Sequence, residues 1–158
     1  MSYKTILAAL DSKRSAEHLA HFSASICNDF DAHLVGLHVG TLPTVTVMAP
    51  MDVPDPASLK AMQDVALLEA REIKQTFDDA MTGKGVDYEW RNLLSASGFS
   101  AAGAIENARY SDLVIARQSD DLSTSEAKSD IDSFLYESGR LVLLVPHNLT
   151  EPRPIKRI

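Results

Sequence analysis

Short apolar runs alternate with amphipathic helical patterns along this chain, and the alternation restricts the fold more than any other feature. The first run, Thr5–Leu10, stops at Asp11, and a helical pattern follows at once. Similar runs occupy residues 33–39, 86–91, 112–116 and 141–145. Strands that alternate with helices form parallel sheets joined by right-handed crossovers. We therefore predict an α/β fold with a doubly wound, five-stranded parallel sheet in the order 3-2-1-4-5 and helices on both faces.

Local signals place the first two helices. Apolar residues recur at steps of three and four over Ser15–Asp29, which predicts one buried helical stripe. Asp55 followed by Pro56 is a favourable helix start, with the acid as N-cap and proline at the first helical position. An apolar stripe is expected to continue along this second helix through Leu59, Met62, Ala66, Ala70, Ile73, Phe77 and Met81.

Glycines and serines predict several of the remaining boundaries. Gly40 is expected to end the second strand, Ser95 or Ser97 to cap the third helix, and Gly139 to follow the fourth. Residues 41–55 are apolar but interrupted by three prolines, which excludes a central strand. We expect this segment to be a surface loop or a contact for a protein partner.

Composition excludes several classes of function. The 158-residue chain has a formal net charge of −7 and a pI of about 5.1, which disfavours binding to nucleic acid or an anionic membrane. No apolar run approaches the roughly 20 residues of a membrane span. Cys27 is the single cysteine, so an intramolecular disulfide is excluded. A reducing cytoplasm fits this composition best.

The sequence contains no strong catalytic or metal-binding motif. Gly98 and Gly103 have the spacing of a phosphate loop, but the lysine and the hydroxyl residue that should follow are absent. His18 and His21 are expected to lie on the surface, because a zinc site needs three or four converging ligands. Cys27 lies on the apolar stripe of the first helix and is expected to be a core thiol. Because no nucleophile–base pair is visible, we do not predict an enzyme.

The predicted topology nevertheless defines a place for a ligand. In a doubly wound sheet, ligands bind outside the carboxyl ends of the strands that flank the switch point, here strands one and four. The loops at those ends are 11–14 and 117–121. The first contains a carboxylate and two cations, and the second contains an arginine followed by two acids. The cations in these two loops are Lys13, Arg14 and Arg117.

Four segments together resemble the universal stress protein family over nearly the whole chain. They are Lys4–Ser12, Ala32–Val39, Ile105–Ile115 and Ser138–Pro146. The resemblance implies the adenine nucleotide alpha hydrolase-like fold and a stress-response domain at residues 1–147. It also implies that residues 148–158 are a tail. If the chain resembles the first half of a tandem member, this tail is expected to be the start of a linker to a second domain.

The nucleotide motif of the ATP-binding members is only partly present. Asp11 and Val39 match the residues that close the first and second strands in that branch. Arg117 and Asp120 stand at the first two glycines of its Gly-x2-Gly-x9-Gly-Ser/Thr signature, and Ser129 is the one residue that matches its end. Side chains at these glycines obstruct the backbone cradle around phosphates. The resemblance thus implies a branch without ordinary ATP binding, and the alternative is an adenine-nucleotide sensor that binds ATP or AMP through Asp11, Val39, Arg117 and Ser129.

The last strand is expected to form an interface. It is apolar along its length and the topology places it at a sheet edge, which needs a partner. Resemblance to the family implies pairing there, in a homodimer or between the halves of a tandem chain. The interface residues would be Leu141, Val142, Leu143, Leu144 and Val145. Our leading hypothesis is a domain that acts by dimerisation and partner binding.

Overall fold

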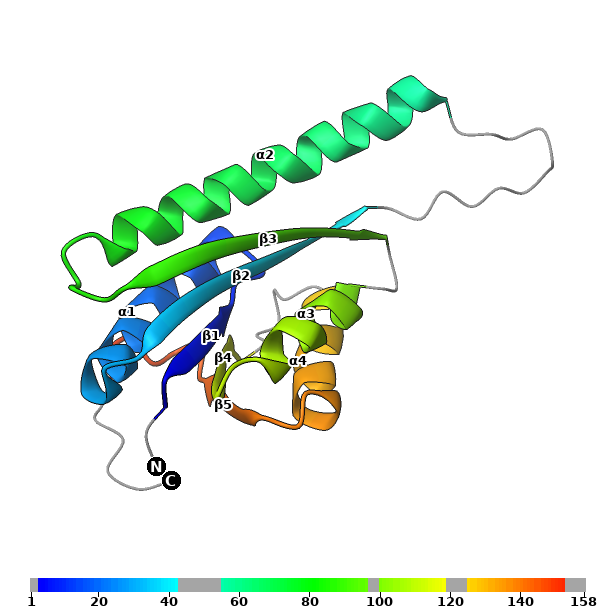
Figure 1. Cartoon of the computed structure of the whole chain (residues 1–158). Coiled ribbons are helices and arrows are strands. Elements are labelled where there is room, and N and C mark those ends of the chain that lie inside the picture. The colour runs from blue at the N-terminus through cyan, green and yellow to red at the C-terminus, as the bar shows by residue number, and fades with distance from the viewer. Residues whose placement is uncertain (1–2, 43–54, 97–99, 119–124, 153–158) are drawn as a thin grey trace.

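The computed structural model describes residues 3–42, 55–96, 100–118 and 125–152, and these form one five-stranded sheet with four helices (Figure 1). All strand pairs are parallel and the order is β3-β2-β1-β4-β5, as predicted. The elements are β1 (Thr5–Ala9), α1 (Lys13–Phe30), β2 (His33–Leu42), α2 (Pro56–Met81), β3 (Tyr88–Ala96), α3 (Ser100–Arg109), β4 (Leu113–Arg117), α4 (Ser125–Glu137) and β5 (Leu141–Val145).

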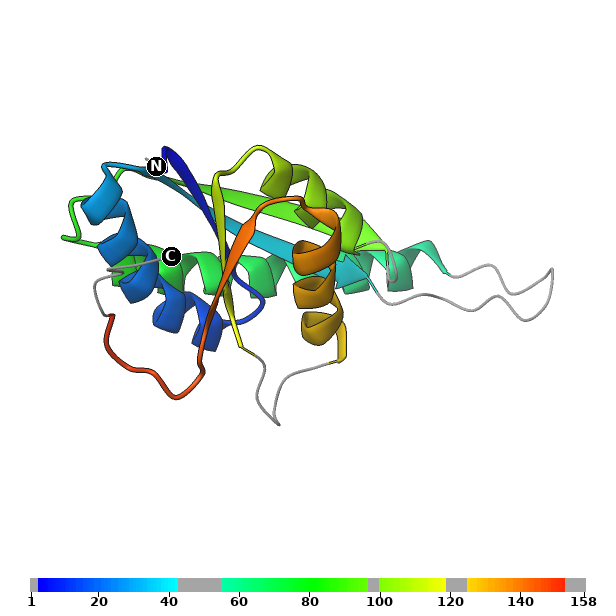
Figure 2. The ribbon, with the colours of Figure 1, turned by 90° about the horizontal axis from the view of Figure 1, so that it is seen from below.

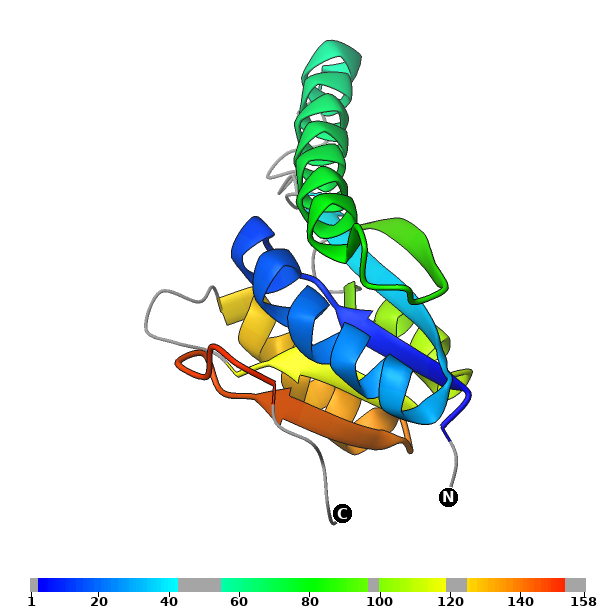
Figure 3. The ribbon, with the colours of Figure 1, turned by 90° about the vertical axis from the view of Figure 1, so that its left-hand side faces the viewer.

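The helices cover both faces of the sheet. Figures 2 and 3 show α1 and α2 on one side and α3 and α4 on the other. Side chains alternate along each strand, so one face of β1 contributes Ile6 and Ala8 to the core beneath α1 and α2, and Leu7 faces the smaller core beneath α3 and α4. The two cores account for the nearly continuous apolar sequence of β1. No helix among the described residues is long and apolar enough to cross a bilayer.

Helix α1 begins directly after β1 through a reciprocal cap. Ser12 is the N-cap: its hydroxyl accepts a hydrogen bond from the Ser15 amide, and the Ser15 hydroxyl oxygen accepts one from the Ser12 amide. These bonds satisfy amides that have no partner inside the helix. The helix ends at Asp31, which adopts a left-handed backbone conformation with φ of 52°. The cap fixes the direction in which the chain leaves the carboxyl end of β1.

Helix α2 packs on the sheet only through its C-terminal half. Ala70, Ile73, Phe77 and Met81 are buried there, and the ring of Phe77 lies against Tyr88 and Trp90 of β3. The expected continuation of the stripe is wrong at its N-terminal end, where Leu59 is 40% and Met62 is 37% exposed. Val65, Leu67 and Leu68, which were not part of the predicted stripe, are exposed as well. The reason is geometric: this end of α2 reaches past the sheet (Figure 1).

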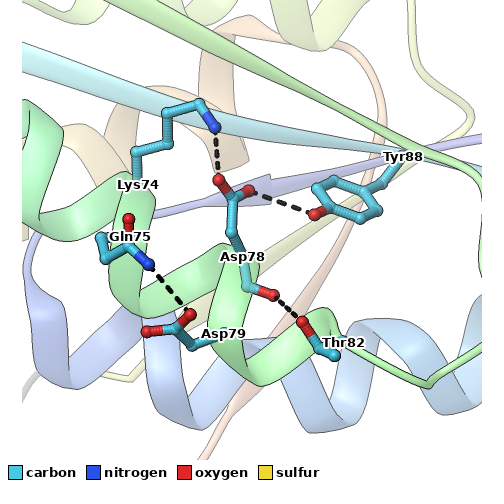
Figure 4. Close-up of polar contacts among 6 residues, drawn as sticks. All are labelled: Lys74, Gln75, Asp78, Asp79, Thr82 and Tyr88. Carbon is cyan, nitrogen blue, oxygen red and sulfur yellow. Dashed lines mark hydrogen bonds and ion pairs between the residues drawn. The ribbon is translucent and has the colours of Figure 1, made fainter.

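Polar contacts fasten the C-terminal end of α2 to the edge strand β3 (Figure 4). Asp78 forms an ion pair with Lys74, and the Tyr88 hydroxyl donates to the same carboxylate at 3.2 Å. Burial and the negative charge of Asp78 raise the pKa of Tyr88 above its ordinary value. The Thr82 hydroxyl donates to the Asp78 carbonyl and the Gln75 amide donates to Asp79. The Tyr88–Asp78 bond joins α2 to β3, and the other contacts order the last turns of the helix around it.

The boundaries of β2, β3 and α3 differ from the prediction. Strand β2 continues past Gly40 to Leu42, and β3 runs to Ala96, because the two strands pair with each other beyond the end of β1. Gly40 is paired with Leu94 in this ladder, so it does not end the strand. Helix α3 therefore starts later than expected, at Ser100 rather than after Ser95 or Ser97. The bounds of β5 are as predicted.

The start of β1 is held to β4 by one carboxylate. Asp112 accepts hydrogen bonds from the backbone amides of Lys4 and Thr5 at 2.8 and 3.0 Å. These bonds favour the ionised form and lower the pKa of Asp112 below its ordinary value of 3.8. A lowered pKa means that the carboxylate stabilises the fold above the unfolded-state pKa, and that this contribution disappears as the pH falls through the folded-state pKa.

We expect Asp112→Ala to lower the free energy of unfolding by about 1 kcal/mol at pH 7, because two amides lose a charged acceptor. The difference in free energy of unfolding between the variant and wild type should shrink as the pH falls below 3.8, because the Asp112 carboxyl of folded wild type then becomes protonated and loses its charge. Thermal denaturation between pH 7 and 3 measures this, with exposed Asp64→Ala as the control. A difference that is independent of pH would contradict the role of the charge.

A close contact between Gly36 and Phe77 gives a second prediction. A Cβ at Gly36 would lie 2.8 Å from Cε1 of Phe77, whose side chain is fully buried. Gly36→Ala should therefore lower the free energy of unfolding by about 1–3 kcal/mol. Combining it with Phe77→Leu removes the clashing ring atoms, so the double variant should lose less than the sum of the two single variants. Strict additivity in chemical denaturation would show that the contact is not responsible.

Candidate functional site

A cavity of about 210 Å³ lies at the carboxyl edge of the sheet, where the sequence predicted a ligand site. Strands β1, β2 and β4 end at it, and α2, α3 and α4 contribute apolar walls through Ala66, Ala104, Ile131 and Phe134. Asp11, Val39 and Arg117 all line this cavity. Asp120 lies outside the described residues, and the side chain of Ser129 is likewise not described. Three of the four predicted nucleotide contacts are thus brought together.

Asp11 is placed by the junction between β1 and α1. It is exposed, and its Oδ1 accepts a hydrogen bond from the Ser12 hydroxyl at 2.9 Å. Because Ser12 is itself the helix cap, the Asp11 carboxylate is oriented at the rim of the cavity. Lys13, a cation of the predicted ligand loops, instead forms an ion pair with Glu72 of α2 at 2.6 Å. Lys13 therefore joins the two helices and does not line the cavity.

Arg117 carries the positive charge of the site. It is the last residue of β4 and is only 9% exposed. Among the described residues that line the cavity, Arg117 is the one cation, and Asp11 and Glu69 are the anions. A buried guanidinium is a strong hydrogen-bond donor to carboxylates and phosphates. The arrangement suits a ligand with a single small anionic group.

His38 belongs to the site, although the sequence analysis did not identify it. It lies on β2, is 4% exposed and lines the cavity. Nδ1 lies 2.7 Å from the carbonyl oxygen of Leu10, which can only accept a hydrogen bond, so Nδ1 carries the proton. The ring stacks on Trp90 with centroids 6.3 Å apart. The available signal was a polar residue inside the otherwise apolar run that forms β2.

His18, His21 and Cys27 do not line the cavity. His18 is half-buried rather than on the surface as predicted, because its Nε2 contacts the Leu149 carbonyl at 2.5 Å and its ring lies against Phe22. His21 is exposed, as predicted. Cys27 is a buried core thiol, and burial raises its pKa to about 12. Within the described ranges, no group of three or more potential metal ligands converges.

The predicted interface strand β5 lies at the edge of the sheet. Leu141 is 49% exposed and Leu144 is 36% exposed, whereas Val145 is buried in the core. Val142 and Leu143 are intermediate. The segment 41–55, predicted as a loop or partner contact, falls mainly on residues 43–54, which lie outside the described residues.

Comparisons with known proteins bear on the fold. No protein-family profile matches the chain, and no curated protein matches it. Solved structures do match. A universal stress protein family member from Burkholderia pseudomallei is 22% identical, with a TM-score of 0.64, over 91% of this chain and 96% of that one.

Two further matches contain nucleotides. The universal stress protein from Archaeoglobus fulgidus in complex with dAMP is 15% identical, with a TM-score of 0.60, over 91% of this chain and 98% of its own. A universal stress protein family protein from Arabidopsis thaliana with AMP bound is 16% identical, with a TM-score of 0.58, over 92% of each chain. The resemblance expected from four sequence segments is therefore confirmed in three dimensions: the chain has the fold of the universal stress proteins.

Proposed function

We propose that this chain is a stress-response domain of the universal stress protein type whose cavity binds an adenine nucleoside monophosphate. The observation that carries the proposal is the convergence of Asp11, Val39 and Arg117 on one cavity at the carboxyl edge of the sheet. Two solved structures with this fold contain AMP or dAMP, which supports the choice of ligand. The role is binding and not catalysis, in a cytoplasmic protein.

The chemistry of the cavity favours a monophosphate over ATP. The cavity is smaller than the ~300–1,000 Å³ of pockets for drug-sized ligands. Arg117 offers one positive charge, and the carboxylates of Asp11 and Glu69 would repel further phosphates. Arg117 also occupies the first glycine position of the ATP-binding motif, so the backbone there is less able to close around a triphosphate. A single phosphate on Arg117 satisfies these constraints.

Calorimetric titration tests the proposal directly. AMP should bind to wild type more tightly than ATP, and Arg117→Gln should weaken AMP binding by about tenfold or more, because a charged hydrogen bond is lost. Adenosine has no phosphate, so its affinity should be nearly the same in the two proteins. Equal AMP affinity in wild type and Arg117→Gln, or tighter binding of ATP than of AMP, would contradict the proposed ligand.

A second proposal concerns assembly. Edge strand β5 exposes Leu141 and Leu144, and no strand among the described residues pairs with its outer edge, which favours pairing with another strand. We infer that two copies associate through β5, so that these leucines become buried. Each apolar side chain that is removed from water contributes about 1.5–3 kcal/mol at full burial, and a two-fold interface counts each leucine twice.

Leu144→Lys should convert the dimer to a monomer, because it would bury a charge without a partner in an apolar interface. Sedimentation velocity across a range of concentrations measures the change. Leu94→Lys is the matched control, since Leu94 is 39% exposed on the opposite edge strand β3. A wild-type protein that stays monomeric at high concentration, or a dimer lost only in Leu94→Lys, would exclude the β5 interface.

A further inference from the structure

His38 presents a buried hydrogen-bond acceptor that nothing among the described residues satisfies. Its Nδ1–H donates to Leu10, which leaves Nε2 as the nitrogen with a free lone pair. No described residue donates to Nε2, and this nitrogen is buried. A buried polar atom without a partner is unfavourable by about 1–3 kcal/mol. Such atoms are uncommon in native proteins, and each one requires an explanation.

The register of the sheet places His38 in line with the anion contact. Ala9 of β1 is aligned with Leu37 of β2 and with Ala116 of β4, and His38 and Arg117 are the residues that follow. Alternation along the strands puts both on the sheet face covered by α1 and α2. The two strands are separated by β1, so the two residues lie ~10 Å apart across the sheet. This separation is comparable with the length of a nucleoside monophosphate.

Gly40 leaves space beside the unpaired nitrogen. It lies two residues beyond His38 on the same face of β2, and it also lines the cavity. A Cβ at this position would lie 3.7 Å from Nε2 and 3.3 Å from Cδ1 of Leu94. A side chain at this position would pack against Nε2 and Leu94, and glycine leaves that space unfilled. Trp90 and Leu94 make the surroundings of this space aromatic and apolar.

We propose that Nε2 of His38 accepts a hydrogen bond from the 6-amino group of adenine, with the base lying over Gly40 and the phosphate on Arg117. The inference rests on the proposed function and adds the determinant of base specificity. A lone pair selects a donor, and adenine has an amino group where hypoxanthine and guanine have a carbonyl oxygen. The apolar surroundings fit a flat base better than a ribose, whose second hydroxyl would be left without a partner.

The test compares AMP with IMP, which differ at position 6 of the base. Wild type should prefer AMP by about tenfold, the value of one hydrogen bond. In His38→Asn the side-chain NH₂ group can donate to the Leu10 carbonyl in place of Nδ1–H. The shorter side chain has no acceptor atom at the position of Nε2. This variant should lose most of its AMP affinity relative to wild type, keep its affinity for IMP, and bind the two nucleotides about equally. Thermal denaturation of the variant establishes that it is folded.

A spectroscopic measurement supports the same test without any substitution. In protein labelled with ¹⁵N at histidine, the Nε2 resonance of His38 should shift on addition of AMP and not on addition of IMP. Gly40→Ala, which adds a methyl group 3.7 Å from Nε2, should reduce the preference for AMP. If His38→Asn retains the tenfold preference, or if Nε2 does not respond to AMP, the assignment of His38 is overturned. If wild type binds neither nucleotide, the proposed function itself fails.

Discussion

Parallel pairing of β1 on both of its edges is the constraint on which the rest of the molecule depends. Its ladders with β2 and β4 place the ends of three strands at one edge of the sheet. Those ladders bring Asp11, His38 and Arg117, which are far apart in sequence, to a single cavity. The Ser12 cap then turns the chain into α1, so the end of β1 remains open to the cavity. Site and fold are therefore set by the same hydrogen-bond ladders.

Much of this arrangement was predictable, because it depends on local patterns. Apolar runs, helical periodicity and the Asp55–Pro56 start predicted the element order and the parallel sheet, and the strand order was taken from the doubly wound topology. The errors arose where pairing between distant segments decides the outcome. The ladder between β2 and β3 extends both strands beyond the expected ends, and the length of α2 relative to the sheet leaves Leu59 and Met62 partly exposed.

Some residues of the candidate site were predictable from the sequence and others were not. Asp11 and Arg117 were predictable, since they end strands that flank the switch point of the sheet. His38 was not, because its importance depends on the carbonyl of Leu10 and on the absence of a side chain at Gly40. The partner of Lys13 was equally hidden, since Glu72 is on another helix and approaches it only after α1 and α2 pack. Such relations are set by tertiary packing and leave little trace in periodicity or motif spacing.

Helix α2 combines three of the features described above in one rigid element. It has 26 residues and is therefore about 39 Å long. Its C-terminal turns are fastened to β3 through Asp78, its middle lines the cavity through Ala66 and Glu69, and its first turns reach past the sheet. A small tilt about Asp78 would displace the beginning of the helix about twice as far as the cavity wall.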